Sequence, residues 1–375
     1  MMAERRVAII GCGQLAQMMA QEGRSLGITF SFVALGEEST VCVQDLGEVV
    51  RVGDSPDAGS LYRELGCPEV ITTEREDVPP GLLRALQEFC PVYPQADAVE
   101  KTQHRLREKL ALLESGVPVA PFLPAENYHD VCAAIGYLGY PAFIKACESG
   151  YDGKNQWRVD SVAQLEQLRD ELAPGSYVVE KGVPFSREVS IVGVRSASGE
   201  TRSYPLTENR HENGTLLVSR APAADGNGEL ETAQRYLATL LDDWDYVGVL
   251  TMECFVTRSG ILVNELAPRV HNSGHWTLAG APVSQFANHL RAILGMPLGD
   301  TTCAQPAAMV NMLGVDTIPR TPNEGVWLYG KRRRPGRKLG HVIMLDESTE
   351  SLDRRVEEVL AELYTSDTPE RSANA

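Results

Sequence analysis

Apolar runs and amphipathic segments alternate over the first hundred residues, and this alternation constrains the fold more than any other feature of the chain. A short apolar strand is predicted at 6–10 and runs into Gly11 and Gly13. A helix with apolar residues at helical spacing follows, and a second strand begins at Thr29. A strand, a glycine turn, a helix and a second strand are the usual opening of a doubly wound parallel sheet. We therefore expect an α/β domain over residues 1–100.

The turn after the first strand reads Gly11-x-Gly13-x-x-Ala16, which imitates the fingerprint of dinucleotide-binding, Rossmann-like domains. Glu37 stands after the second strand, where such domains carry the acid that binds a ribose. A tight strand-to-helix turn needs glycines whatever it binds, so the fingerprint is weak evidence for a nicotinamide cofactor. Three possibilities remain for this loop: it binds NAD, it binds a phosphate, or it binds no ligand.

The next segment, EKTQHRLREKLALLESG, is predicted to form one helix from Glu100 onward. Arg105 and Lys109 are four residues apart and share a face of that helix, where a solvated basic surface is the simplest interpretation. The prolines of GVPVAPFLP then force an extended crossing, because proline cannot continue a helix. This crossing leads into a second domain, which we place at 101–300.

A lysine and a glycine-rich loop follow one another in this second domain. Lys145 ends an apolar strand, and Gly150 and Gly153 lie in the loop after it. A strand lysine beside such a loop is a usual way to hold nucleotide phosphates, although a surface lysine in a plain turn would look the same. Two further strands place Glu180 and Glu188 near a Gly-Pro turn. The strand end E-K-G-V can offer backbone groups to an adenine edge, and Glu180 can accept from an amino or hydroxyl group. The simpler interpretation is that Glu180 and Glu188 are surface glutamates.

Two strands, VLTMECFV and GILVNEL, are predicted to form a hairpin through Thr257, Arg258 and Ser259. If the hairpin is centred on Ser259, Glu253 faces Glu265 on the neighbouring strand. Facing side chains lie roughly 5 Å apart and like charges repel there, so the pair favours a bound cation. Hard oxygen ligands suit Mg²⁺ that arrives with nucleotide phosphates. Two solvated glutamates on an exposed hairpin are the alternative.

Polar residues crowd the connection after this hairpin, APRVHNSGHW, and this density suggests a site for an anionic ligand. A second cationic segment, YGKRRRPGRKLGH, lies in the C-terminal part, which we expect to be a small β-rich domain over 301–375 that ends in a helix and a polar tail. Its glycines and proline constrain six basic residues in an acidic chain, so a phosphate site is favoured over a solvated charge run. The residues concerned are Arg269, His271, Asn272, Ser273 and His275 in the first segment and Lys331 to Lys338 in the second.

The composition excludes several classes of partner. A formal net charge of −16 argues against a general nucleic-acid or anionic-membrane surface, since both select for basic patches. The eight cysteines include no C-x-x-C pair, so reduced thiols in a cytoplasmic protein are the simplest account. No run approaches the roughly 18 apolar residues of a membrane span, and the N-terminus lacks the apolar core of a signal peptide. We expect a soluble, cytoplasmic protein.

The order of these signals resembles that of the ATP-grasp ligases. One family matches in particular, 5-(carboxyamino)imidazole ribonucleotide synthetase, the ATPase subunit of phosphoribosylaminoimidazole carboxylase. The resemblance covers about residues 5–345 and implies a Rossmann-like N-terminal domain, a central ATP-grasp domain and a C-terminal β-rich domain. It is carried by the segments GCGQLAQMM, IKACESGYDGKNQW, EKGVPFSREVS, ENRHENG, MECFV, NELAPRVHNSGHWT and YGKRRRPGRKLGH.

Members of that family carboxylate the exocyclic amine of 5-aminoimidazole ribonucleotide in de novo purine (IMP) biosynthesis, and they are usually homodimers. The resemblance therefore implies a carbon–nitrogen ligase that uses ATP, Mg²⁺ (or Mn²⁺) and bicarbonate, and that releases ADP and phosphate. Because bicarbonate is a poor electrophile, its phosphorylation to carboxyphosphate would precede transfer to the amine. Whether carboxyphosphate or CO₂ released from it meets the amine stays open.

The resemblance also implies roles for particular residues. Lys145 would offset charge on the phosphates, Arg269 would stabilise an anionic intermediate, and His271 or His275 would take up a proton. Glu253 and Glu265 would bind the magnesium. Nucleotide contacts are implied for Arg105, Lys145, Gly150, Tyr151, Asp152, Gly153, Lys154, Asn155, Gln156, Glu180, Lys181, Gly182, Val183, Glu188, His211, Asn264 and Glu265. Substrate contacts are implied for Gln14, Leu15, Glu76, Tyr151, Arg269, His271, Asn272, Ser273, Lys331, Arg337 and Lys338.

Some segments depart from the family pattern. Glu148, Ser149 and Asn155 replace residues of a loop that is richer in arginine and glycine, and Arg75 lies in a segment that is more apolar in the family. Strict alternation along the hairpin turns Asn264 away from the two glutamates, so a bulge or a peripheral role is required. A related ATP-grasp ligase that uses another amine or formate, an NAD-dependent oxidoreductase and a silent nucleotide-binding regulator remain alternatives.

Overall fold

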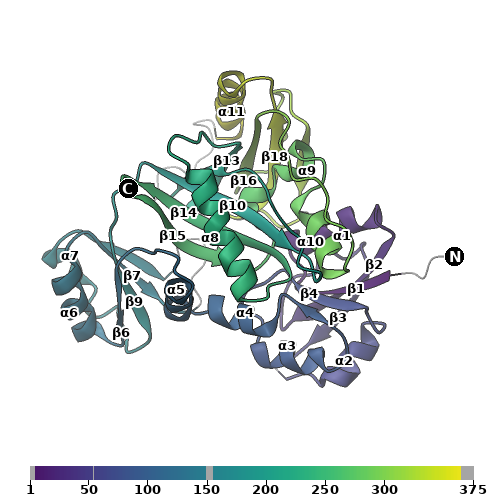
Figure 1. Cartoon of the computed structure of the whole chain (residues 1–375), viewed down its shortest axis with the longest axis horizontal. Coiled ribbons are helices and arrows are strands. Elements are labelled where there is room, and N and C mark those ends of the chain that lie inside the picture. The colour runs from purple at the N-terminus through teal and green to yellow at the C-terminus, as the bar shows by residue number, and fades with distance from the viewer. Residues whose placement is uncertain (1–4, 54, 149–154, 365–375) are drawn as a thin grey trace.

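Three β-sheets organise the part of the chain that the structure describes. The structure is a computed structural model and describes residues 5–53, 55–148 and 155–364 (Figure 1). The N-terminal residues form a parallel sheet, the next segment a small antiparallel sheet, and the rest a large antiparallel sheet. The expected combination of α/β and α+β architecture is confirmed. Within these ranges, none of the helices has the length and apolar character required to cross a membrane.

The N-terminal sheet has five parallel strands in the order β3-β2-β1-β4-β5. Val7 and Ile9 belong to one buried cluster and Ala8 and Ile10 to another, as expected for a strand covered on both faces. The doubly wound, Rossmann-like prediction is therefore confirmed. The elements are β1 (Arg5–Ile10), α1 (Gln14–Arg24), β2 (Ile28–Leu35), β3 (Glu48–Val52), α2 (Ala58–Glu64), β4 (Val70–Thr73), α3 (Pro80–Gln87) and β5 (Val92–Tyr93).

Two helices, α4 (Ala96–Thr102) and α5 (Arg105–Glu114), lead into the second domain, and the prediction of a single helix is wrong. His104 adopts an extended conformation between them, and its ring caps the first turn of α5. The Arg105 backbone N–H donates to the Cys147 carbonyl at 2.9 Å, a contact with a distant strand end. The cap and this tertiary contact replace helical hydrogen bonds.

The small sheet has antiparallel strands in the order β6-β9-β7-β8, and α6 and α7 pack against it (Figure 1). Neighbouring strands β7 and β9 carry Lys145 and Glu180. The sequence of residues 162–172 predicts a helix, but the helix ends at Gln167 and continues as a turn. The elements are β6 (Phe122–Ala125), α6 (Tyr128–Leu138), β7 (Ala142–Ala146), β8 (Gln156–Val159), α7 (Val162–Gln167) and β9 (Tyr177–Lys181).

The large sheet runs in the order β15-β14-β10-β12-β13-β16-β18-β17, with β11 paired to β10. The strands after residue 301 continue this sheet through the pairing of β13 with β16, so the expected boundary near residue 300 separates strands of one sheet. The expected final helix is α11. The elements are β10 (Arg187–Arg195), β11 (Thr201–Ser203), β12 (Thr207–Glu212), β13 (Thr215–Ala221), α8 (Glu229–Asp243), β14 (Gly248–Thr257), β15 (Gly260–Ala267), η1 (Asn272–Gly274), α9 (Thr277–Gly280), α10 (Gln285–Ile293), β16 (Ala307–Leu313), β17 (Gly325–Leu328), β18 (Lys338–Leu345) and α11 (Thr349–Leu363).

Candidate active site

The hairpin of β14 and β15 brings Glu253 opposite Glu265, but not by the symmetry expected from its sequence. The turn consists of Arg258 and Ser259 alone, so the predicted three-residue turn is wrong. In an uninterrupted ladder of this register, Asn264 would stand opposite Glu253. A β-bulge shifts the register next to this position and pairs Glu253 with Glu265 instead. Asn264 is the extra residue of the bulge, which resolves the conflict with strict alternation.

The two facing carboxylates have pKa values shifted in opposite directions. Burial and the charge of Glu253 raise the pKa of Glu265. Burial also acts against ionisation of Glu253, but the neighbouring rings of His271 and His211 outweigh it and lower the pKa of Glu253 to about 2. A divalent cation would relieve the repulsion between the carboxylates, whose oxygens are the hard ligands that Mg²⁺ prefers. Among the described residues no three acidic, histidine or cysteine side chains gather to hold a metal.

Three buried charged side chains form one group beside the hairpin and contact its Asn264. Lys145 on β7 and Lys109 on α5 each lie 3.1 Å from one carboxylate oxygen of Glu180 on β9. Lys145 also donates to Asn264 Oδ1 at 3.4 Å. Burial alone would raise the pKa of Glu180, but the charges of the two lysines lower it. Two lysines and one carboxylate leave one net positive charge directed at the hairpin.

This group corrects two expectations. Lys109 is 1% exposed, so its interpretation as part of a solvated basic face is wrong. Both oxygens of Glu180 contact lysines and its side chain is 4% exposed, so its interpretation as a surface glutamate is wrong, while a contact with a nucleotide stays a prediction. Lys109 is a site residue that sequence reasoning missed, and its spacing from Arg105 was the signal available. Arg105 itself donates to the Ala146 carbonyl at 2.8 Å, beside the strand that carries Lys145.

Two imidazoles and a third glutamate border Glu253. His271 Nε2 lies 3.0 Å from Glu253 Oε1, and His211 Nε2 lies 4.0 Å from Glu253 Oε2. Glu188 contacts His211 Nδ1. Burial alone would lower the pKa of His211, but the Glu188 carboxylate has the larger effect and raises it. His275, the other histidine expected to take up a proton, is fully buried, and burial holds its pKa well below the ordinary value. Of the two histidines expected to take up a proton, His271 is the one that contacts the carboxylate pair.

The loop after the hairpin is anchored by side chains inside the protein. Arg269 lies 2.7 Å from Glu76 of the N-terminal domain, so these two predicted substrate residues are brought together. The side-chain amides of Asn272 and Asn311 exchange two hydrogen bonds, at 2.6 and 3.1 Å, and Ser273 is 0% exposed. Asn272 and Ser273 therefore direct their side chains to internal partners, and direct substrate contact stays a prediction for both.

The glycine loop after β1 is filled by the chain itself. Glu74, which follows β4, accepts hydrogen bonds from backbone N–H groups at the start of α1, among them that of Gly13. A Cβ on Gly13 would lie 2.6 Å from Glu74 Oε1, which explains the glycine. Glu38, and not the expected Glu37, accepts from the Cys12 N–H at 3.0 Å. These are the donors that a dinucleotide pyrophosphate would use, so the NAD-dependent alternative is wrong.

The basic segment between β17 and β18 packs against this filled loop. Lys331 Nζ contacts Gln14 Oε1 at the start of α1. Burial lowers the pKa of Lys331, and the charges of Arg337 and Lys338 act in the same direction. Cations that repel one another at a partly buried position favour an anion between them, as predicted for this segment. Leu15, also expected at the substrate, packs its side chain into the core.

Part of the predicted nucleotide site lies outside the described residues. Asn155 and Gln156 lead back into β8 beside β7. Lys181, Gly182 and Val183 follow one another at the end of β9, and the N–H groups of the first two donate to proline carbonyls at 2.8 and 2.7 Å. An adenine edge placed there would meet neither of these donors. The residues outside the description are Ser149, Gly150, Tyr151, Asp152, Gly153 and Lys154.

Glu108 is a second residue near the site that sequence reasoning missed. It lies on α5, is 3% exposed, and accepts a hydrogen bond from the Leu266 backbone N–H. Burial, together with the charge of Glu265, raises the pKa of Glu108 to about 8. A protonated acid therefore stands beside the carboxylate pair at neutral pH.

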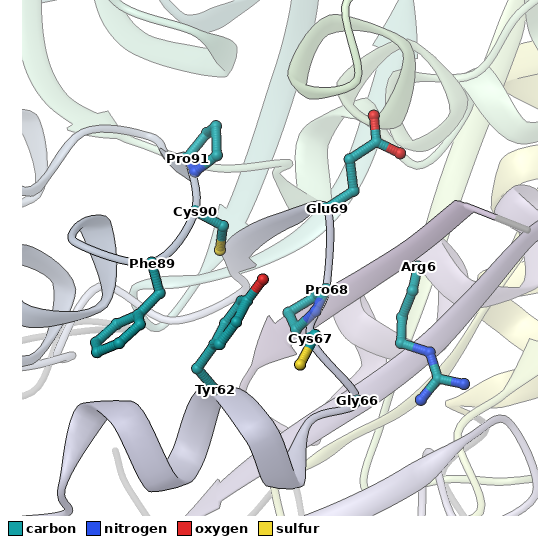
Figure 2. A pocket seen from close by; sticks show the side chains of 9 residues that line it. All are labelled: Arg6, Tyr62, Gly66, Cys67, Pro68, Glu69, Phe89, Cys90 and Pro91. Carbon is teal, nitrogen blue, oxygen red and sulfur yellow. The ribbon is translucent and has the colours of Figure 1, made fainter. Parts of the chain in front are cut away.

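A surface cavity of about 620 Å³ lies at the far end of the N-terminal sheet (Figure 2). Its lining includes Arg6 on β1, Glu69 before β4 and Pro91 before β5, together with the rings of Tyr62 and Phe89. These positions are at the amino ends of the parallel strands, whereas ligands of doubly wound sheets bind beyond the carboxyl ends. The cavity is therefore separate from the candidate site.

Comparisons with known proteins match nearly the whole chain. Models of a ribonucleotide synthetase preATP-grasp domain, an ATP-grasp domain and a phosphoribosylaminoimidazole carboxylase C-terminal domain match residues 4–103, 110–286 and 307–355. A Pseudomonas aeruginosa protein named N5-carboxyaminoimidazole ribonucleotide synthase is 38% identical, over 95% of this chain and 99% of its own. The crystal structure of N5-carboxyaminoimidazole ribonucleotide synthetase from Thermus thermophilus has a TM-score of 0.86 at 39% identity, covering 96% of this chain and 98% of that chain. A Staphylococcus aureus N5-carboxyaminoimidazole synthetase complexed with ADP has a TM-score of 0.87 at 29% identity, covering 94% and 96%.

The matched segments follow the order of the sheets described above, and the relatives align with this chain along almost their whole length. The sequence resemblance to the ATP-grasp ligases is thereby confirmed. On both sequence and fold, the chain belongs to the N5-carboxyaminoimidazole ribonucleotide synthases.

Proposed function

We propose that this protein catalyses the ATP- and bicarbonate-dependent carboxylation of 5-aminoimidazole ribonucleotide, giving N5-carboxyaminoimidazole ribonucleotide for purine biosynthesis. The observation that carries the proposal is the facing pair Glu253 and Glu265, linked through Asn264 to Lys145 and Glu180. This arrangement suits a polyphosphate with its cation. The basic segment before β18 supplies a second, separate anion site, as a reaction between a nucleotide and a sugar phosphate requires.

The nucleotide half of the reaction uses the buried lysine group. Lys145, held by Glu180 and Asn264, offsets charge on the phosphates while the γ-phosphoryl group moves to bicarbonate. Lys109 shares the Glu180 carboxylate, so the group keeps its net positive charge. Glu253 and Glu265 would hold Mg²⁺, which when bound supplies Lewis-acid stabilisation of the phosphoryl oxygens. The products of this half are ADP and carboxyphosphate.

The substrate half uses the loop after the hairpin and the basic segment. Lys331, Arg337 and Lys338 bind the phosphate of the ribonucleotide. Arg269, fixed by Glu76, stabilises the anionic carboxyl group as it passes from carboxyphosphate to the exocyclic amine, while the phosphate leaves and the amine gives up one proton. His271 lies against Glu253, at the border between the two halves.

Glu265→Gln tests the metal pair without a change in side-chain size. We expect ADP release that depends on 5-aminoimidazole ribonucleotide to fall by about a hundredfold or more, because the cation loses one of its two carboxylates. Circular dichroism and thermal unfolding should show a folded protein. Glu64→Gln, on the exposed surface of α2, is the matched control and should keep wild-type turnover. Wild-type turnover in Glu265→Gln would contradict the metal assignment.

The same ADP assay tests the substrates by omission. Turnover should vanish without bicarbonate or without 5-aminoimidazole ribonucleotide. Turnover with formate in place of bicarbonate, or with another amine, would instead support a related ATP-grasp ligase. ATP binding without turnover under every condition would support a silent regulator.

We further propose that the protein works as a homodimer in the cytoplasm. Family resemblance supports the dimer, and the eight cysteines, all within the described ranges, are free thiols as a reducing compartment favours. Light scattering after size exclusion under assay conditions measures the mass of the particle. A monomer that turns over at full rate would contradict the dimer.

A further inference from the structure

Behind His271 lies a chain of buried hydrogen bonds that crosses three strands of the large sheet. Ser219 on β13 bonds to Asn209 Oδ1 on β12 at 2.8 Å, and Asn209 Nδ2 bonds to Ser190 Oγ on β10 at 2.9 Å. Ser190 Oγ lies 2.8 Å from Ser273 Oγ, which lies 2.9 Å from His271 Nδ1. The three serines are 0% exposed and Asn209 is 7% exposed. We call these four residues the Ser–Asn relay.

The strand register places the Ser–Asn relay on the face of the sheet that carries the carboxylate pair. Asn209 pairs with Ser219 across β12 and β13, and Ser190 pairs with Glu253 across β10 and β14. Paired residues of neighbouring strands point to the same face. Buried hydroxyl and amide groups are costly unless they are bonded, and each member of the relay has a partner. The relay is therefore an ordered structure that ends at the ring of His271.

The direction of the relay is fixed at its His271 end. The Ser273 backbone N–H donates to His271 Nδ1 at 3.3 Å, so this nitrogen accepts and carries no proton. The proton of the neutral ring is then on Nε2, which lies 3.0 Å from a carboxylate oxygen of the facing pair. An unprotonated Nδ1 determines the donor of each later hydrogen bond in the relay. The Ser273 hydroxyl donates to Nδ1, and the Ser190 hydroxyl donates to Ser273. The Asn209 amide N–H donates to Ser190, and the Ser219 hydroxyl donates to the Asn209 carbonyl oxygen.

We propose that Ser190, Asn209 and Ser219 are positioning residues that hold His271 in the tautomer with its proton on Nε2. This inference rests on the proposed function and narrows it. His271 presents a hydrogen-bond donor toward Glu253 and the reacting groups, and Nε2 in this tautomer cannot accept a proton. His271 therefore stabilises an anionic oxygen by donation, in place of the proton uptake suggested by the sequence.

Asn209→Asp tests the direction of the relay, because it keeps the shape of the side chain and removes its amide donor. The carboxylate accepts from both neighbouring serines, so Ser190 no longer donates to Ser273. The Ser273 hydroxyl is then free to accept from Nδ1, and only the longer contact from the Ser273 N–H, at 3.3 Å, still favours an unprotonated Nδ1. The ¹⁵N shifts of imidazoles in protein labelled with ¹⁵N-histidine distinguish the two tautomers, and His271→Gln assigns the signals. At about pH 8.5, above the ordinary histidine pKa, we expect Nε2–H in the wild type and a move toward Nδ1–H in Asn209→Asp.

A second variant and a matched control complete the experiment. Ser190→Ala cuts the relay without adding a carboxyl group, and the signals of His271 should shift toward an average of the two tautomers. Asn288→Asp introduces a carboxyl group at another buried position, on α10, where Asn288 is 0% exposed and bonds to Tyr204 and to Gly299 outside the relay. This control should leave His271 unchanged. In the ADP assay, Asn209→Asp should lower kcat about tenfold or more and change the KM for ATP less than about twofold.

A proton on Nδ1 of His271 in the wild type would overturn the proposal. Unchanged His271 signals in both relay variants would also overturn it, as would an equal change in Asn288→Asp. The tautomer is measured without turnover. Absence of substrate-dependent ADP release would therefore overturn the proposed function and leave the tautomer assignment in place.

Discussion

Glu108→Gln should stabilise the protein, and the gain should grow with pH. Burial and the charge of Glu265 raise the pKa of Glu108 from an ordinary 4.5 to about 8. Because the folded-state pKa is the higher one, the folded protein keeps a proton that the unfolded chain loses between these two values. The stability contributed by the protonated acid is complete below pH 4.5 and is lost as the pH rises through about 8.

The size of the effect follows from the width of this window. Each pH unit within it corresponds to about 1.4 kcal/mol of unfolding free energy. The window from 4.5 to about 8 sets an upper limit of about 5 kcal/mol. Glutamine removes the ionisable group and keeps the oxygen that accepts from the Leu266 N–H. We expect a gain of about 3 kcal/mol near pH 7.5 and less than about 1 kcal/mol near pH 5.

Urea unfolding from about pH 5 to about pH 8.5, without nucleotide or magnesium, measures this gain. The difference between variant and wild type removes the contribution of the titrating groups that do not interact with Glu108. Glu64→Gln is the matched control, and its difference should stay near zero at each pH because this side chain is exposed. A difference that does not change with pH, or a variant less stable than wild type at high pH, would refute the raised pKa and its cause.

Two other substitutions test the neighbouring charges. Lys109→Met leaves the buried Glu180 carboxylate with a single lysine, and we expect the free energy of unfolding to fall by about 3 kcal/mol in urea. A fall below about 0.5 kcal/mol would mean that the ion pair behaves like a surface one. Lys331→Met removes a cation of the phosphate site and should raise the KM for 5-aminoimidazole ribonucleotide about tenfold, with the KM for ATP unchanged in the ADP assay. An equal rise in both KM values would contradict a separate phosphate site.

The parts of the fold that the sequence predicted correctly are those whose signals are local. Apolar runs and glycine turns predict β1, α1 and β2, and each signal lies within or next to the element that it predicts. The break between α4 and α5 carries no such mark, because the Arg105 N–H leaves the helical pattern for the carbonyl of Cys147, far along the chain. The union of the C-terminal strands with the large sheet also depends on a long-range pairing, that of β13 with β16.

The site residues also divide into those with a local sequence signal and those that depend on distant contacts. The order of motifs was enough to predict Glu253, Glu265 and Lys145 as neighbours. The spacing of Lys109 from Arg105 was a signal, but neither Lys109 nor Glu108 could be predicted as buried, because charged residues on a helix are ordinarily solvated and only tertiary partners keep them buried. A bulge adds one residue without disturbing composition or spacing, so alternation alone turned Asn264 away from the site.

The hydrogen bond between Lys145 and Asn264 joins two different sheets, and this has a consequence for motion. The hairpin and the two strands that flank the basic segment belong to one sheet, so paired backbones would set the distance between the two proposed binding sites. Lys145 and Glu180 belong to the small sheet, which lies apart from the large one (Figure 1). Side-chain contacts open more easily than strand ladders. Opening and closing around ATP should therefore swing the small sheet as a body, with the Lys145–Asn264 bond broken first.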